Sequence, residues 1–80
     1  MERKYVTVIA EVRPDGDLYP KTLRFEDGSE FKIDRRLQTP RRDPAKDGTS
    51  DWRFYCLIEG REVTLFYNAD THRWWIGREA

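Results

Sequence analysis

The sequence predicts an all-β fold, a small antiparallel barrel of five to six short strands joined by tight turns. The densest apolar run, Trp52 to Tyr67, is interrupted in its middle by Glu59-Gly60, which is typical of a β-hairpin. Other short segments alternate apolar and polar residues with the period of a strand, and turn residues separate them. No stretch shows helical periodicity over enough residues to predict a helix.

The central hairpin has a register that its own residues specify. A two-residue turn at Glu59-Gly60 sets opposite each other Cys56 and Val63, Phe54 and Leu65, and Trp52 and Tyr67. All six side chains then fall on one face, because side chains alternate along paired strands. A slip of one residue would scatter them over both faces, so we expect this register to hold.

A first hairpin precedes it along the chain. Residues 5–13 alternate as a strand does, with the valines on one face. The residues Pro14-Asp15-Gly16-Asp17 predict a four-residue loop. This loop sets opposite each other Val8 and Leu23, Val6 and Phe25, and Val12 and Tyr19. Pro20 has no N–H to donate, so we expect an edge or a bulge in that part of the second strand.

The third strand is predicted at about residues 30–38. A two-residue turn at Asp27-Gly28 would place charged side chains opposite apolar ones. A three-residue turn with Gly28 in the left-handed region is therefore expected. It puts four apolar residues on one face: Leu23, Phe25, Phe31 and Ile33.

One long connection, residues 39–51, follows the third strand. Its two prolines, its glycine and its shortage of apolar residues predict an irregular loop. Loops of this length are often functional or mobile. The last strand is predicted at 73–77, after a turn at Asp70-Thr71 that aligns Trp74 with Tyr67 and Ile76 with Leu65.

Six short strands in a meander must hide an apolar face and two edges. Curling into a small SH3-like barrel does both, and the alternative is a strongly bent open sheet that dimerises. Eighty residues make one domain. The prediction is thus a single barrel over residues 1–80, with an irregular loop at 39–51.

Composition argues against several classes of function. Fifteen Lys and Arg residues balance fifteen Asp and Glu residues, whereas a dedicated nucleic-acid binder is usually basic overall or on one face. No stretch approaches the ~20 apolar residues of a membrane span, and the first residues lack the apolar segment and cleavage site of a signal peptide. We therefore expect a cytoplasmic protein without a membrane partner, and the single cysteine is compatible with that.

The sequence offers no catalytic set. Cys56 is the only thiol, and its place on the central strand points it into the core, where a cysteine is inert. His72 is the only histidine and lies in or beside a turn. No Gly-rich phosphate loop, metal-ligand spacing or Ser-His-Asp set is visible. We expect a protein that is not an enzyme, with no catalytic residue, metal site or cofactor.

The outward face of the central hairpin is more informative. Arg53, Tyr55 and Phe66 point outward when their neighbours point inward, and Trp75 of the last strand lies beside Phe66. An exposed cluster of aromatics with an arginine is typical of an interaction site. Three interpretations stay open. The long loop or the N-terminus covers this face as a second small core, a protein partner or a second copy of the chain binds it, or bases stack on it.

Basic residues also gather near the long loop. Between Arg35 and Lys46 there are five basic residues against a single aspartate. Arg41 and Arg42 are among them and suit phosphates or an acidic partner. Over residues 34–51 further aspartates reduce the excess to five against four, so local cancellation of charge is the simpler interpretation.

Several turn and core motifs follow one another in a distinctive order. They are Tyr5-x-Thr7-Val8, Pro14-Asp15-Gly16, Phe25-x-Asp27-Gly28, Ile33-Asp34-Arg35 and a Trp-rich last strand. In this order the chain resembles a family of small uncharacterised bacterial all-β proteins. The resemblance runs along most of the chain and implies a fold rather than a chemistry, because that family has no established function.

Together these features predict a non-catalytic interaction module that binds a protein partner, or itself, through an aromatic and arginine face. The predicted binding residues are Arg53, Tyr55, Phe66, Trp75, Arg41 and Arg42. The alternative is a small nucleic-acid-binding barrel that uses the same aromatics together with the arginine-rich loop.

Overall fold

The computed structural model of the chain describes residues 2–44 and 50–78, and seven strands lie within these ranges. The strands are β1 (Glu2–Val12), β2 (Leu18–Arg24), β3 (Glu30–Arg36), β4 (Arg41–Pro44), β5 (Ser50–Ile58), β6 (Arg61–Asn68) and β7 (Arg73–Arg78). No helix is present in the described part of the chain, so none there is long and apolar enough to cross a membrane.

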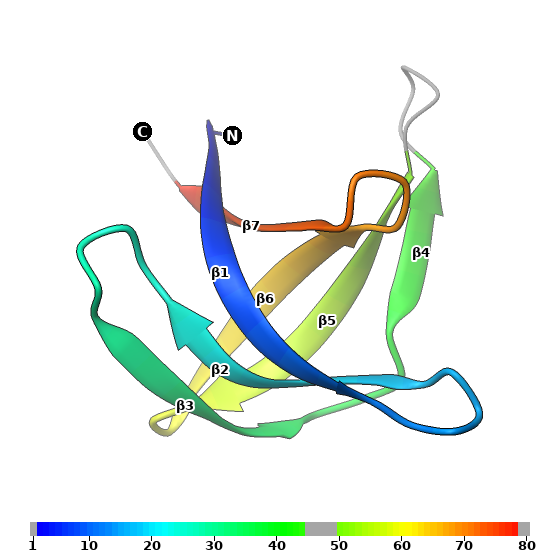
Figure 1. The fold of residues 1–80 in the computed structure, drawn as a ribbon, viewed down its shortest axis with the longest axis horizontal. Helices are drawn as coiled ribbons and strands as arrows, with labels where there is room; N and C mark the ends of the chain where they lie inside the picture. The colour runs from blue at the N-terminus through cyan, green and yellow to red at the C-terminus, as the bar shows by residue number, and fades with distance from the viewer. Residues whose placement is uncertain (1, 45–49, 79–80) are drawn as a thin grey trace.

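Six of the strands close an antiparallel barrel (Figure 1). β1, β2 and β3 form one meander, and β5, β6 and β7 form a second. The two meanders are joined where β1 pairs with β7 and where β3 pairs with β5. Each strand of the barrel therefore has a neighbour on both sides, which confirms the predicted small barrel and excludes the open sheet considered as its alternative.

The long strand β5 takes part in both the barrel and an extra pairing. Its end, from Cys56 to Ile58, pairs with β3 and closes the barrel. Its start, from Ser50 to Arg53, pairs with β4 outside the barrel. The strand order places β4 at the edge of the sheet, next to β5.

The prediction of an irregular loop at 39–51 is wrong for the residues that form β4 and for the first two residues of β5. Charged side chains and a proline are what an edge strand tolerates, because its outer N–H groups need no partner strand. The same residue types are typical of a loop, which is why the sequence suggested one. Residues 45–49 of that prediction lie outside the described residues.

The central hairpin has the predicted register. Its pairs include Cys56 with Val63, Phe54 with Leu65 and Trp52 with Tyr67. The turn between the strands has positive φ angles, 50° at Glu59 and 77° at Gly60. Two positive φ angles in a two-residue turn match the right-handed twist of the strands that the turn connects. The turn chemistry and the apolar pattern thus favour one register.

The first hairpin follows its prediction up to a bulge. Val8 lies opposite Leu23 as expected, and the register then shifts between Ile9 and Ala10. Ala10 is paired with Pro20, so the bulge expected at that proline is present. Because β2 carries one extra residue there, Val12 is paired with Leu18, and the predicted pairing of Val12 with Tyr19 is wrong.

Two further turns agree with their predictions. Phe25 donates its backbone N–H to the carbonyl oxygen of Ser29 at 3.0 Å, which leaves a three-residue turn between them. Gly28 has a φ of 89° in that turn, a conformation that costs glycine little because it has no Cβ. At the last hairpin Tyr67 is paired with Trp74, as the sequence predicted.

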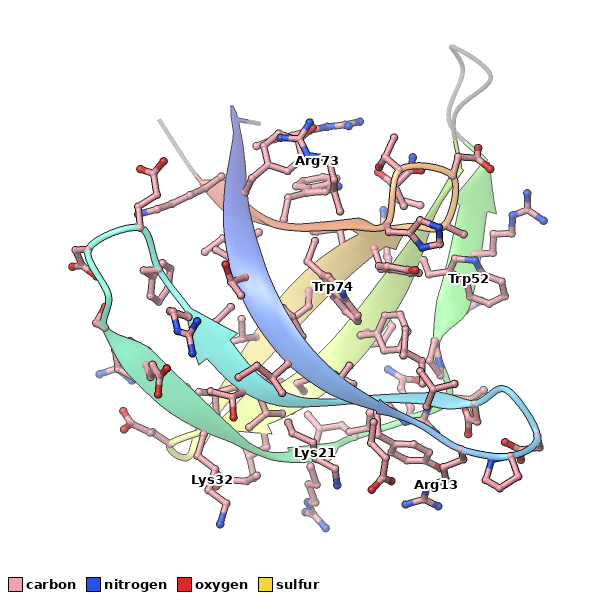
Figure 2. All side chains as sticks on the ribbon, in the orientation of Figure 1. Arg13, Lys21, Lys32, Trp52, Arg73 and Trp74 are labelled. Carbon is pink, nitrogen blue, oxygen red and sulfur yellow. The ribbon has the colours of Figure 1, made fainter. Side chains whose placement is uncertain are left out.

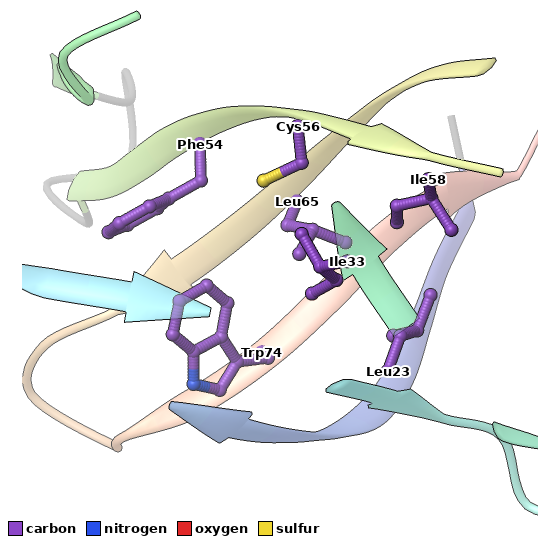
Figure 3. Packing of buried hydrophobic residues seen from close by; sticks show 7 residues of the cluster. All are labelled: Leu23, Ile33, Phe54, Cys56, Ile58, Leu65 and Trp74. Atoms are coloured by element: carbon purple, nitrogen blue, oxygen red, sulfur yellow. The ribbon is translucent and has the colours of Figure 1, made fainter. Parts of the chain in front are cut away.

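The core lies inside the barrel and draws on both meanders (Figure 3). Its buried side chains are Leu23, Ile33, Phe54, Cys56, Ile58, Leu65 and Trp74. Leu65 and Cys56 have no exposed surface. The Trp74 ring packs against Phe54, with 5.0 Å between the ring centroids. Leu23 of β2 and Ile33 of β3 share this cluster with residues of β5, β6 and β7, so the core joins the two meanders.

The core position of Leu65 gives a first prediction. Leu65→Ala should lower the free energy of unfolding by about 2–5 kcal/mol, because it leaves a cavity in a fully enclosed site. Ile9→Ala is the control, since Ile9 is 48% exposed on the outside of β1. Ile9→Ala should lower the free energy of unfolding by less than about 1 kcal/mol. Urea denaturation measures both, and equal losses would contradict the assignment of the core.

Candidate functional site

Five side chains form a continuous line across the outside of the barrel. Pairing of neighbouring strands sets opposite one another Arg41 of β4, Arg53 of β5, Phe66 of β6, Trp75 of β7 and Tyr5 of β1. We name these five residues the outer row. Because Phe54 and Trp74 point into the core, their chain neighbours in the outer row point away from it.

The aromatic rings of the outer row are each covered by an arginine. Phe66 and Trp75 stack on one another, with 4.0 Å between ring centroids and 10° between their planes. The Arg3 guanidinium lies 4.6 Å from the centre of the Trp75 ring, and the Arg53 guanidinium lies 5.7 Å from that of Phe66. Arg73 lies 3.6 Å from the centre of the Tyr5 ring. These are cation–π contacts, which attract a positive group to the face of a ring. Figure 2 shows Arg73 beside the N-terminal part of β1.

A buried carboxylate fixes the position of Trp75. The indole Nε1–H of Trp75 donates to Oδ2 of Asp51 at 3.1 Å, and the Nδ2–H of Asn68 donates to Oδ1 at 3.0 Å. The Arg3 guanidinium lies 3.7 Å from the same carboxylate. Asp51 is only 8% exposed. A charge this buried is stable where hydrogen bonds and an opposite charge surround it, as they do here.

Trp75 lies beside Phe66 as predicted, and of the three interpretations left open for this face the structure favours a covered one. The exposed fraction of this tryptophan is 5%, because Phe66, Arg3 and Asp51 surround it. This outcome agrees with the interpretation in which part of the chain covers the face as a second small core. The cover includes Arg3, from the N-terminal end of β1, and Asp51, the last residue of the segment predicted as a loop.

The structure brings together four of the six predicted binding residues. Arg41, Arg53, Phe66 and Trp75 all belong to the outer row. Tyr55 is half-buried, two residues from Arg53 along β5, and therefore on the same face as the outer row. Arg42 lies opposite Trp52, so it belongs to the other face of β4.

Arginines dominate this part of the surface. Arg3 and Arg73 join Arg41 and Arg53 around the aromatic rings, and we name these four arginines with Tyr5, Phe66 and Trp75 the arginine face. Arg41 and Arg53 lie directly opposite each other on paired strands. Like charges in that position repel one another. Among the described residues, the Asp51 carboxylate lies 3.7 Å from Arg3 of the arginine face and is 8% exposed.

The sequence reasoning missed three residues of this arrangement. Arg3 and Arg73 each lie two residues from an outer-row aromatic on the same strand, which places them on the same face. Strand alternation would have found Arg3 if the first strand had been predicted to begin before residue 5. Arg73 was within the last predicted strand, on the face of Trp75, and could have been found by the same alternation. Asp51 lay within the segment predicted as a loop, where alternation cannot be applied.

The groups considered for catalysis do not form a site in the structure. Cys56 has no exposed surface, and burial raises the pKa of its thiol from 9.0 to about 11. His72 is exposed in the last turn, and its Nδ1 lies 3.0 Å from the Tyr67 hydroxyl. Among the described residues no group of three or more His, Cys, Asp or Glu side chains suits a metal ion.

Comparison of the chain with models of known protein families, with curated proteins and with solved structures gives no match. The likeness to a bacterial family therefore stays a resemblance, carried by turn and core residues. The geometry described above is the basis for the proposals that follow.

The hydrogen bond between Trp75 and Asp51 gives a second prediction. Trp75→Phe keeps a ring but removes the N–H, so it should lower the free energy of unfolding by about 1–3 kcal/mol. Trp52→Phe is the matched control, because no hydrogen bond from the Trp52 indole is recorded within residues 2–44 and 50–78. Thermal and urea denaturation measure the difference. Equal losses in the two variants would show that the bond to Asp51 contributes nothing.

The buried thiol gives a third prediction. The pKa of Cys56 is raised in the folded protein, so the unfolded thiol loses its proton first as the pH rises. The contribution of the buried thiol to the free energy of unfolding is complete below pH 9.0 and should be lost progressively towards about pH 11. Cys56→Ala should not show this pH-dependent loss of stability. Urea denaturation of both proteins at several pH values therefore isolates the contribution of the thiol. A thiol reagent should also react with Cys56 only after unfolding, and rapid reaction of the native protein would contradict its burial.

Proposed function

We propose that the protein is a non-catalytic binding module whose arginine face binds an acidic segment of a partner protein. The observation that carries the proposal is the pairing of Arg41 with Arg53 in the outer row. Arginines placed opposite each other on paired strands concentrate positive charge at one point of the face. A negatively charged side chain would be attracted to that point.

The surroundings of the pair support an anionic partner. Arg73 stands at the other end of the same surface, over the Tyr5 ring. Its guanidinium takes part in no recorded ion pair within the described ranges. The Asp51 carboxylate is 8% exposed and accepts a hydrogen bond from Trp75. It therefore lies beneath the surface that a partner would contact. A partner with several carboxylates would have complementary charge along the whole row.

A protein partner fits this surface better than single-stranded nucleic acid. Stacking of bases needs exposed aromatic rings. Trp75 is 5% exposed and is already stacked on Phe66, so it offers no open face. Tyr5, at 39%, is the exposed ring of the row, and Arg73 lies over it. The balance of fifteen basic against fifteen acidic residues also disfavours a nucleic-acid binder.

A second copy of the chain is a poor partner for the same surface. Two-fold pairing of the arginine face would bring Arg41 and Arg53 of one copy near those of the other. Such like-charge contacts act against association. Nucleic acid remains the second candidate, because four arginines on one face suit phosphate groups.

Two finer descriptions belong to the same proposal. We describe the barrel as SH3-like because two short meanders, β1–β3 and β5–β7, cross one another around a single core. We also propose a cytoplasmic location, with which the free Cys56 is compatible. A small barrel in that compartment would act as a module that binds other cytoplasmic proteins.

The proposal predicts salt-sensitive binding of an acidic peptide. A fluorescently labelled peptide rich in Glu and Asp should bind, and its affinity should fall as ionic strength rises. The double variant Arg41→Ala/Arg53→Ala should weaken binding about tenfold, since it removes two exposed charge pairs. Fluorescence anisotropy measures both effects.

The control is Lys32→Ala/Arg61→Ala, which removes the same charge from exposed positions on β3 and β6. An equal effect of this control would mean that net charge alone matters, which would contradict the assigned site. An oligothymidine strand is the competing ligand. If it binds more tightly than the peptide and loses affinity in the Arg41/Arg53 variant, the face is a nucleic-acid site.

A further inference from the structure

One end of the barrel contains a second site, separate from the arginine face. A cavity of about 270 Å³ opens there between the β1–β2 turn, the β3–β4 connection and the strands β5 and β6. Its main lining residues are Asp17, Leu18, Pro40, Trp52, Phe54 and Tyr67. We name it the mouth pocket. Figure 2 shows Trp52 beside β4 and β5, at the side of the molecule to which the β1–β2 turn also reaches.

Three aromatic rings form the inner wall of the mouth pocket. Trp52 and Tyr67 lie opposite each other on β5 and β6. The rings of Phe54 and Tyr67 are 6.4 Å apart between centroids and inclined at 85°. Rings at such an angle present their faces in different directions, so they line a concave site on more than one side. Leu18 and Pro40 add aliphatic surface to it.

The three pocket rings differ from most other aromatic rings of the described chain in their contacts with cations. Elsewhere a Lys or Arg lies over five rings, those of Tyr5, Tyr19, Phe25, Phe66 and Trp75. Within the described residues no such contact is recorded for Trp52, Phe54 or Tyr67. Phe54 is 3% exposed, and one side of the Tyr67 ring packs on Trp74 with 4.6 Å between ring centroids. The half-buried rings of Trp52 and Tyr67 are therefore the ones that offer surface to a cation from outside.

A carboxylate lies at the edge of the same pocket. Asp17 is the charged residue of its lining. The Nη1 and Nη2 atoms of Arg36 lie 2.9 and 3.2 Å from its two oxygens, and Leu18 donates its backbone N–H to Oδ1 at 3.0 Å. These contacts, first of all the one with Arg36, lower the pKa of Asp17 below its ordinary value of 3.8, so it is ionised at neutral pH.

The cation that neutralises Asp17 is directed away from the pocket. The Arg36 guanidinium lies 3.8 Å from the centre of the Tyr19 ring and donates to the carbonyl oxygen of Leu18. Its side chain is 12% exposed, and neither Arg36 nor Tyr19 belongs to the lining of the mouth pocket. A ligand in the pocket would meet the carboxylate and the three rings rather than the guanidinium.

We propose that the mouth pocket binds a quaternary ammonium group. The half-buried rings of Trp52 and Tyr67 attract a cation, and methyl groups on nitrogen reduce the cost of removing it from water. Leu18 and Pro40 provide contacts for those methyl groups, and Asp17 adds an opposite charge at the edge. The residues that line the pocket offer an anion no cationic side chain, and a neutral ligand would gain only from apolar burial.

The test compares a cation with its neutral isostere. Choline carries a trimethylammonium group, and 3,3-dimethylbutan-1-ol carries a tert-butyl group of the same shape without charge. NMR titration of the ¹⁵N-labelled protein follows the indole N–H signals of the three tryptophans. Choline should shift the Trp52 signal and bind about tenfold more tightly than the alcohol. The Trp75 signal, which reports the bond to Asp51, should not move.

Two variants localise the effect. Trp52→Leu should lower choline affinity about tenfold. Tyr5→Leu, which removes an aromatic ring from the arginine face, should leave it unchanged. The Arg41→Ala/Arg53→Ala variant should also bind choline normally, so the two proposed sites can fail independently. The comparison of choline with the alcohol in the unaltered protein does not depend on any variant folding.

A second ligand distinguishes whether the quaternary ammonium group comes from a small molecule or from a protein side chain. A short peptide with one trimethyllysine carries the same group on a protein side chain, and whichever of peptide and choline binds more tightly indicates the natural source. Equal affinity for choline and the alcohol would overturn the proposal, because the pocket would then be merely apolar. Failure of both choline and the peptide to shift the Trp52 signal would overturn it as well.

Discussion

The register of the β5–β6 hairpin is the constraint on which the rest of the structure depends. It points Phe54, Cys56 and Leu65 into the barrel, where the latter two are fully enclosed. By the same alternation it points Arg53 and Phe66 outward, into line with β4, β7 and β1. A shift of one residue would exchange the two faces and lose both the core and the arginine face.

The Asp51 carboxylate fixes the arrangement of side chains on the outer surface. By accepting hydrogen bonds from Trp75 and Asn68 and lying beside Arg3, it connects β5, β6, β7 and β1 on the side away from the core. The aromatic rings of the outer row are thereby held in fixed positions, and arginines rather than rings form its accessible groups. Binding at this surface should therefore depend on charge rather than on base stacking.

Local patterns were sufficient for most of the fold. Alternation and turn residues predicted the central register, the three-residue turn at Gly28 and the bulge at Pro20, because each depends on residues close in sequence. The edge strand β4 was missed because its arginines and proline are equally typical of loops. The burial of Trp75 was left open among three interpretations, and the mouth pocket was missed, because both require contacts between distant segments, such as Arg3 with Asp51, or Pro40 with Trp52.

Mapping of the binding surface by NMR would test the proposed function most directly. A Glu- and Asp-rich peptide is added to the ¹⁵N-labelled protein, and the backbone amide signals that shift are assigned to residues. Our account predicts that shifts concentrate at Tyr5, Arg41, Arg53 and Arg73, and that the β2–β3 turn around Gly28 is unaffected. Shifts centred on the β2–β3 hairpin, or spread evenly over the molecule, would contradict it.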